Sequence, residues 1–189
     1  MDSSAVLALF RASGALHEGH FKLSSGLHSG GYLQSALVLQ HPAHAQTLGG
    51  ALADRLRPLN PTVVLSPALG GLIIGHEVAR GLGVRAIFAE RQDGILTLRR
   101  GFALSPIDRV VVIEDVVTTG LSTRETVACA SAAGATTVGA GSLIDRSGGK
   151  SGLSVPFHAL VEFTVTNYEP DECPMCAAGQ PVTKPGSRG

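Results

Sequence analysis

Charge is scarce in this sequence. Acidic and basic residues make up 16% of its 189 residues, and 15 of each sign cancel to a net charge of zero. A chain without a basic excess is not expected to bind nucleic acids or membrane surfaces in general, because both need surplus positive charge. No apolar run reaches the roughly 18 residues of a membrane-spanning helix. The first residues also lack the basic segment of a secretory signal.

Cysteine is equally rare, with three in the chain. A small, odd number does not build a disulfide framework, so we expect a reduced, cytoplasmic protein. Cys173 and Cys176 form a C-x-x-C pair before Gly179, a spacing similar to half of a zinc ribbon. Structural Zn²⁺ needs four ligands, so His158 or the same pair from a second subunit would have to complete such a site. Two free thiols or a redox-active pair are the alternatives.

Lysine is the rarest charged residue. The sequence has three lysines, Lys22, Lys150 and Lys184, against twelve arginines. Any site between residues 23 and 149 that needs a basic group must therefore use arginine or histidine.

Short apolar runs that alternate with helical patterns are abundant. At this length, and with 44% hydrophobic residues, we expect one domain with a substantial core. Continuously apolar strands between helices are typical of a parallel α/β sheet that is buried on both faces. The carboxyl ends of such strands meet at one edge of the sheet, where ligands bind. The expected strands are 62–66, 84–90, 110–114 and 137–144.

The two ends of the chain look different from this middle part. Residues 3–15 and 42–56 have helical spacing of apolar residues, and the Gly- and Ser-rich stretch between them suits short irregular strands or a hairpin. The tail after Val165 carries four prolines and is expected to be an extended surface segment.

The stretch 110–125 is the most informative. A buried strand ends in Glu114 and Asp115, a Thr-Thr-Gly turn follows at 118–120, and a helix then begins. A helix N-terminus that follows glycine and hydroxyl groups is a ready phosphate site. The two acids would repel a phosphate, so they should face sugar hydroxyls or Mg²⁺. The alternative is an ordinary strand–turn–helix connection with solvated acids.

The same helix is predicted to open with a capping box made by Ser122 and Glu125. Two other phosphate motifs are absent, since the chain has no G-x-x-x-x-G-K-[ST] and its Gly70–Gly75 segment is not G-x-G-x-x-G.

The stretch resembles the phosphoribosyl-pyrophosphate signature of type I phosphoribosyltransferases, in which two acids and T-x-G follow an apolar strand. Segments 19–26 (GHFKLSSG), 66–71 (SPALGG) and 143–146 (LIDR) are similar to the orotate phosphoribosyltransferases in particular. The resemblance covers roughly residues 1–150. It implies an α/β fold with a mostly parallel central sheet flanked by helices. It also implies a small N-terminal hood at about 17–40, and leaves out a tail at about 167–189.

The resemblance also implies roles for individual residues. Glu114 and Asp115 would hold the ribose hydroxyls of the sugar donor, and Arg146 would bind the carboxylate or a ring carbonyl of orotate. Residues 21–26, including Ser24, would form the hood over the base. The 5-phosphate would lie on Thr118, Thr119, Gly120, Leu121 and Ser122, and pyrophosphate with Mg²⁺ on Ala68, Leu69, Gly70 and Gly71.

The implied reaction is displacement of pyrophosphate from the anomeric carbon of ribose by the pyrimidine nitrogen of orotate. It needs no covalent nucleophile, so Cys129 is expected to be a core residue. A homodimer is implied, with no nucleic acid or membrane partner. A phosphoribosyltransferase for a purine or another base, and a regulatory relative that binds nucleotides without turnover, are the alternatives.

The chain departs from its relatives at three lysines. Ser24 stands where the hood lysine is expected, Gly70 stands in the pyrophosphate loop, and the mobile-loop region 90–102 contains no lysine. We predict that Arg91, Arg99 or Arg100 meets the pyrophosphate instead, the alternative being that Arg99 and Arg100 are solvated. His20 and His28, beside the hood, would contact the base or serve in packing.

Overall fold

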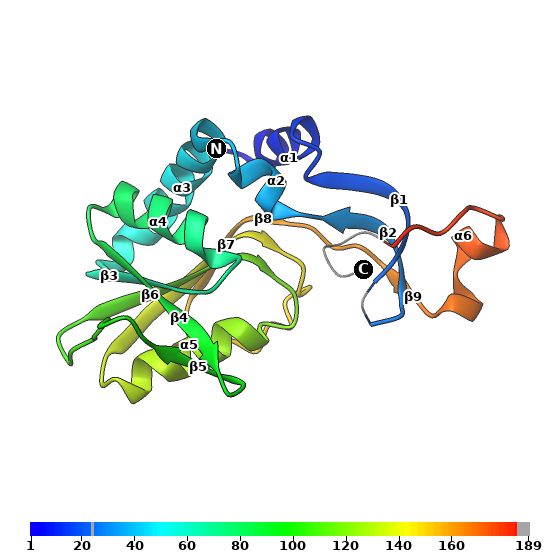
Figure 1. Cartoon of the computed structure of the whole chain (residues 1–189). Coiled ribbons are helices and arrows are strands. Elements are labelled where there is room, and N and C mark those ends of the chain that lie inside the picture. The colour runs from blue at the N-terminus through cyan, green and yellow to red at the C-terminus, as the bar shows by residue number, and fades with distance from the viewer. Residues whose placement is uncertain (24, 185–189) are drawn as a thin grey trace.

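The computed structural model describes residues 1–23 and 25–184. A six-stranded sheet with the strand order β5-β4-β3-β6-β7-β8 forms the centre, and a three-stranded sheet with the order β1-β2-β9 stands beside it (Figure 1). The central strands are β3 (Val63–Pro67), β4 (Arg85–Gln92), β5 (Ile95–Leu98), β6 (Arg109–Val117), β7 (Thr136–Asp145) and β8 (Phe157–Glu162). All neighbours in it are parallel except β4 and β5, which confirms the predicted mostly parallel α/β sheet.

Helices cover both faces of the central sheet. The helices are α1 (Ser3–Ala12), α2 (Ser35–Leu39), α3 (Pro42–Leu56), α4 (Gly71–Leu82), α5 (Leu121–Ala132) and α6 (Pro174–Ala177). In Figure 1, α3 and α4 lie on one side of the sheet and α5 lies on the other. Alternate residues of β6 belong to two separate cores: Val111 and Ile113 pack in the core with α3 and α4, whereas Val110 and Val112 pack in the core with α5. This division explains why the strand is continuously apolar.

Two strands of the central sheet, β5 and β8, were not predicted. β8 extends the sheet beyond β7 by parallel pairing, and its sequence FHALVE is too short and too mixed to stand out. Within the described residues, no helix has the length and apolar character needed to cross a membrane.

The prediction that residues 90–102 form a loop is wrong for residues 90–98, which belong to a hairpin. β4 and β5 form an antiparallel hairpin, with Gln92 opposite Ile95. Asp93 and Gly94 connect them with φ angles of 51° and 85°, the left-handed conformations that a tight hairpin turn needs. The Asp-Gly pair was the sequence signal for this hairpin.

The small sheet combines the two ends of the chain. β1 (Leu16–Lys22) and β2 (His28–Leu33) form the expected antiparallel hairpin. β9 (Asn167–Tyr168) from the tail adds to β2 as a third strand. The tail is therefore not simply extended: a 3₁₀ turn at Pro170–Glu172 and α6 follow β9. That the whole chain is one domain stays a prediction.

Two adjacent glycines of α3 test the packing of α3 on α4. A Cβ on Gly49 would lie 2.9 Å from the carbonyl carbon of Glu77 in α4, whereas a Cβ on Gly50 would meet nothing within 4 Å. We expect Gly49→Ala to destabilise the protein by roughly 1–3 kcal/mol through overpacking. Gly50→Ala should stabilise it by about 0.5–1 kcal/mol, because alanine is the better helix former. Urea unfolding measures both, and equal stability of the two variants would contradict this close helix contact.

Candidate functional site

The acid pair and the loop after β3 meet at the carboxyl edge of the central sheet. β6 carries Glu114 and Asp115 near its end, and β3 lies parallel beside β6. The loop 68–71 follows β3, and its Ala68–Leu69 peptide bond is cis. A Cβ on Gly70 would lie 2.8 Å from Oδ1 of Asp115. The structure thus brings together two segments that are more than 40 residues apart in the sequence.

The carboxyl groups of this pair are largely removed from solvent, Glu114 being buried and Asp115 half-buried. Glu114 is 8% exposed, and its Oε2 has no hydrogen-bond partner in the described part of the chain. Burial, and then the charge of Asp115, raise the pKa of Glu114 from 4.5 to about 8, with Ser122 opposing the shift. Burial also raises the pKa of Asp115, although the amide of Val116 donates to its Oδ1 at 2.9 Å. Two such oxygens are well suited to accept hydrogen bonds from hydroxyl groups.

The loop between β6 and α5 is open to solvent. Gly120 precedes α5 with a φ of 74°, and a Cβ there would overlap the carbonyl oxygen of Ser151. Thr118 and Thr119 are exposed, and the amide of Leu121 donates only a long hydrogen bond, of 3.4 Å, to the hydroxyl oxygen of Thr119. The first amides of α5 are therefore available to an anion.

The predicted capping box is wrong. Because Gly120 already turns the chain, α5 begins at Leu121, and no side chain caps it. Ser122 thus lies inside the helix, and Glu125 forms an ion pair with Arg91 instead.

Arg124 is a site residue that sequence reasoning missed. Its Nη1 donates to the carbonyl oxygen of Thr119 at 2.7 Å and to that of Ser151. It thereby ties the loop between β6 and α5 to the segment after β7. An arginine in the first turn of the helix was the only sequence signal, and it did not indicate this role.

Arg146 lies at the carboxyl end of β7, next to β6. Its amide donates to the carbonyl oxygen of Val117 at 2.7 Å, so Arg146 lies beside the start of the loop between β6 and α5. The side chain is half-buried, and this burial lowers its pKa. It makes no ion pair with any residue in 1–23 or 25–184. Its guanidinium is thus available for an anionic ligand.

The three candidate arginines of the hairpin do not converge on the acid pair of their own chain. Nε and Nη2 of Arg100 donate to both carboxylate oxygens of Glu90, at 2.7 and 2.8 Å, and Arg91 is paired with Glu125. Arg99 is exposed and forms no ion pair with the described residues. Arg99 and Arg100 follow β5, which lies three strand spacings from β6, or roughly 14 Å.

The remaining candidates lie elsewhere or cannot be placed. Ser24 lies outside the described residues. Cys173 and Cys176 lie against the small sheet, where their sulfur atoms face His20 and His28. His158 is in β8 opposite Gly141 and does not belong to this group, so its predicted role as the completing ligand is wrong.

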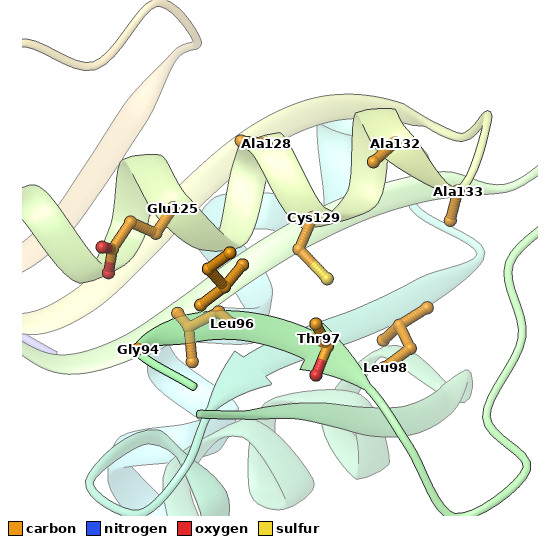
Figure 2. A pocket seen from close by; sticks show the side chains of 10 residues that line it. Gly94, Leu96, Thr97, Leu98, Glu125, Ala128, Cys129, Ala132 and Ala133 are labelled. Carbon is orange, nitrogen blue, oxygen red and sulfur yellow. The ribbon is translucent and has the colours of Figure 1, made fainter. Parts of the chain in front are cut away.

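A separate apolar cavity of about 500 Å³ lies between β5 and α5 (Figure 2). Leu96 and Leu98 line it from the strand and Ala128 and Cys129 from the helix, and Glu125 lies at one end. It contains neither of the paired acids nor the loops that follow β3 and β6. Burial raises the pKa of Cys129, which agrees with its predicted role as a core thiol rather than a nucleophile.

The fold and these loops place the chain among the type I phosphoribosyltransferases. No family model matches it. The structure of orotate phosphoribosyltransferase from Aeropyrum pernix superimposes with a TM-score of 0.67 and 25% identity, over 84% of this chain and 93% of that one.

Closer relatives specify the family. The orotate phosphoribosyltransferase of Pelotomaculum thermopropionicum is 49% identical over 188 residues, covering 100% of this chain and 99% of that protein. The orotate phosphoribosyltransferase of Heliobacterium modesticaldum is 50% identical over 190 residues, covering 100% of both. The chain belongs to the orotate phosphoribosyltransferase family. The similarity includes the tail, which the sequence motifs had left out.

Glu114 should make the ligand-free protein less stable as pH rises. Its raised pKa means that the folded state binds more protons than the unfolded state between pH 4.5 and about 8. Its contribution to stability is complete below that window and is lost as pH rises through it, by on the order of 3–5 kcal/mol. We expect a shallower pH dependence of unfolding in Glu114→Gln, measured by urea denaturation. The exposed Glu162→Gln is the control and should keep the wild-type slope. A wild-type slope in Glu114→Gln would refute the assignment.

Proposed function

We propose that this chain transfers the 5-phosphoribosyl group from phosphoribosyl pyrophosphate to orotate, giving orotidine 5′-monophosphate and pyrophosphate in pyrimidine biosynthesis. The observation that carries the proposal is that the acid pair contacts the loop after β3 next to the open N-terminus of α5. The chain that has this arrangement is about half identical to full-length orotate phosphoribosyltransferases. Homodimer formation stays a prediction from the family resemblance, and a cytoplasmic location stays a prediction from the low cysteine content.

Each polar group of the sugar donor finds a partner at the carboxyl edge of the central sheet. The carboxylates of Glu114 and Asp115 accept hydrogen bonds from the ribose hydroxyls, because both can lose their protons once a polar ligand restores their hydration. The amides and hydroxyls of residues 118–122 bind the 5-phosphate at the positive end of α5. The loop 68–71 offers backbone amides to the pyrophosphate, and Gly70 leaves room for it next to Asp115.

Mg²⁺ also fits this edge. The unpartnered Oε2 of Glu114 and the carboxylate of Asp115 are hard oxygen donors, and Mg²⁺ in proteins is commonly held by one or two carboxylates together with substrate phosphates. When bound, Mg²⁺ neutralises charge on the departing pyrophosphate.

Arg146 binds the acceptor base, orotate. A guanidinium can bind the orotate carboxylate through two parallel hydrogen bonds, and half-burial strengthens that interaction. The chain then aligns the pyrimidine nitrogen with the anomeric carbon and excludes water while positive charge develops on the sugar. No covalent nucleophile is involved.

Pyrophosphate release with a panel of bases tests the function. The protein, phosphoribosyl pyrophosphate and Mg²⁺ should release pyrophosphate with orotate and not with adenine, guanine or uracil. In Arg146→Ala, kcat/KM for orotate should fall roughly 10- to 100-fold, because an ionic hydrogen bond is lost, while the KM for the sugar donor stays unchanged.

Arg57→Ala is the matched control for this test, because Arg57 is an exposed arginine just before β3, at the opposite edge of the sheet. Turnover with a purine but not orotate would overturn the substrate assignment. Binding of the sugar donor without release from any base would indicate the regulatory alternative.

The hairpin arginines would act on the neighbouring subunit's site. The separation between β5 and β6 argues against contact within one chain, and the family resemblance implies a loop that closes over the partner's site. Arg99 is the best candidate of the three, because the other two already engage Glu90 and Glu125.

We therefore expect Arg99→Ala to lower kcat by roughly 10- to 100-fold through weaker stabilisation of the leaving pyrophosphate, and Arg100→Ala to have a smaller effect. Mixing Arg99→Ala with the inactive Asp115→Asn variant should restore activity, up to about a quarter of wild type, since a mixed dimer has one intact site. Near wild-type rates in both arginine variants would refute the proposal. No restoration in the mixture would mean that Arg99 acts in its own chain.

A further inference from the structure

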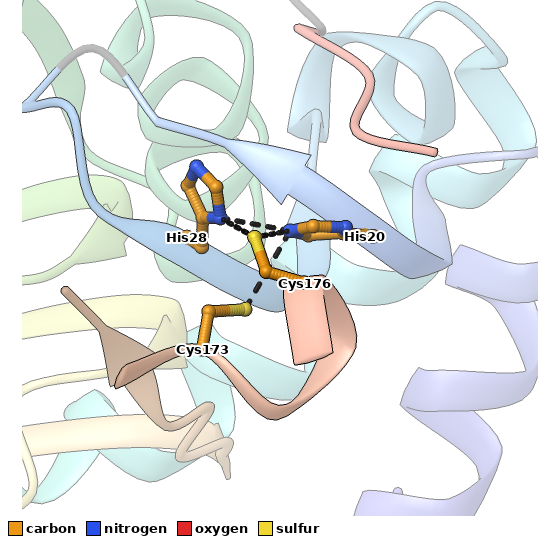
Figure 3. A group of neighbouring side chains, drawn as sticks. All are labelled: His20, His28, Cys173 and Cys176. Carbon is orange, nitrogen blue, oxygen red and sulfur yellow. Dashed lines mark hydrogen bonds between the residues drawn. The ribbon is translucent and has the colours of Figure 1, made fainter. Parts of the chain in front are cut away.

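Four metal-ligand side chains lie together outside the site described above. They are His20 on β1, His28 on β2, and Cys173 and Cys176 on either side of the start of α6. Figure 3 shows the four side chains pointing toward one another. One ligand atom of each lies within 4.8 Å of the ligand atoms of all the others.

The distances between these atoms approach those of a tetrahedral site. Nε2 of His20 lies 2.8 Å from Nδ1 of His28. Sγ of Cys173 lies 3.5 Å from Nε2 of His20, and Sγ of Cys176 lies 3.7 Å from that atom and 3.2 Å from Nδ1 of His28. Zn–N distances of about 2.0–2.1 Å and Zn–S distances of about 2.3 Å place donor atoms roughly 3.3–3.8 Å apart in a tetrahedron. The two imidazole nitrogens would have to move apart and the widest pair, at most 4.8 Å, would have to close for the four atoms to surround an ion.

The tautomer of His20 is set for metal binding. Its Nδ1 lies 2.9 Å from the carbonyl oxygen of Gln180, which can only accept a hydrogen bond. Nδ1 therefore carries the proton, and in the neutral ring Nε2 presents its lone pair to the cluster. A backbone carbonyl on the second nitrogen is the usual outer contact of a zinc-bound histidine.

The tail lacks a hydrophobic reason to be ordered. Between Glu162 and Lys184, all of which the structure describes, Cys173 is the only buried residue, at 2% exposure. The segment nevertheless follows a fixed path. β9 pairs with β2, and beyond α6 the amide of Thr183 donates to the carbonyl oxygen of His20 at 2.9 Å. Fixing so many exposed residues costs conformational entropy that one buried thiol and a few half-buried side chains, among them Phe163 and Val165, offset only in part.

We propose that His20, His28, Cys173 and Cys176 bind one structural Zn²⁺ that fastens the C-terminal segment to the β1–β2 hairpin. Two thiols lose their protons to solvent on binding, so Zn²⁺ with two thiolates and two neutral imidazoles is uncharged overall. This neutrality suits a site in which His20 and His28 are 5% and 6% exposed. A set of two sulfur and two nitrogen ligands with no open position favours Zn²⁺ in a structural role.

Metal content tests the proposal without any substrate, so its outcome is independent of the proposed function. Protein purified without chelators should contain about one zinc per chain, and Cys173→Ser and His20→Ala should contain at least tenfold less. Cys129→Ser and His158→Ala are the matched controls and should keep the metal, because Cys129 lies in the cavity beside α5 and His158 lies in β8.

Two measurements on the wild-type chain test the proposal even if the variants fail to fold. Co²⁺ in place of Zn²⁺ should give the intense visible bands of a tetrahedral ion and a thiolate charge-transfer band. Removal of the metal should speed exchange of the amide hydrogens of Thr183 and Lys22, which bond across β1 and the tail.

Several results would overturn the proposal. These are a reduced protein that takes up no zinc on titration, zinc content that is unchanged in Cys173→Ser, or a Cys173–Cys176 disulfide in freshly purified protein. Iron in place of zinc, or one zinc for every two chains, would equally refute this single-chain zinc site.

Discussion

The close approach of Gly70 to Asp115 is the contact on which the site depends. It exists because β3 and β6 are parallel neighbours, so that the loop after one strand and the carboxylates near the end of the other lie at the same edge. The rest of the central sheet maintains this juxtaposition. Two cores, one on each face, hold β6 between α3 and α4 on one side and α5 on the other. A side chain at position 70 would fill the space between the acid pair and the loop.

The net charge of zero hides an uneven distribution of charge around the site. Two of the 15 acidic residues, Glu114 and Asp115, form a largely buried pair with raised pKa values, and the loop that would hold the 5-phosphate offers neutral amides and hydroxyls. Three of the arginines are already engaged: Arg124 with backbone carbonyls, Arg91 with Glu125 and Arg100 with Glu90. Arg146 and Arg99 form no ion pair among the described residues. The scarcity of lysine therefore limits the basic groups available for the orotate carboxylate and for pyrophosphate to a few arginines.

The small sheet raises a different physical problem. It is built from both ends of the chain and has little apolar surface of its own to bury, since three strands at the edge of a larger fold need packing or a crosslink. The cluster of His20, His28, Cys173 and Cys176 lies where β1, β2 and the tail meet. A metal there would supply the crosslink that hydrophobic packing does not.

Local patterns in the sequence predicted much of the fold and the site. The apolar runs indicated the parallel strands, and the acid pair, the Thr-Thr-Gly turn and residues 68–71 were correctly expected at one edge. These features follow from short-range chemistry: burial on both faces requires continuous apolar strands, and a glycine before a helix leaves amides free. The tertiary structure decided what depends on residues far apart in the chain. It made residues 90–98 part of a hairpin rather than a loop, and it moved Glu125 from a cap to an ion pair with Arg91. It also paired Cys173 and Cys176 with His20 and His28 instead of His158, because pairing of β9 with β2 carries the tail across the hairpin. The spacing of these residues in the sequence does not predict that the cysteines and histidines meet, because their contact depends on how the two ends of the chain come together in the folded protein.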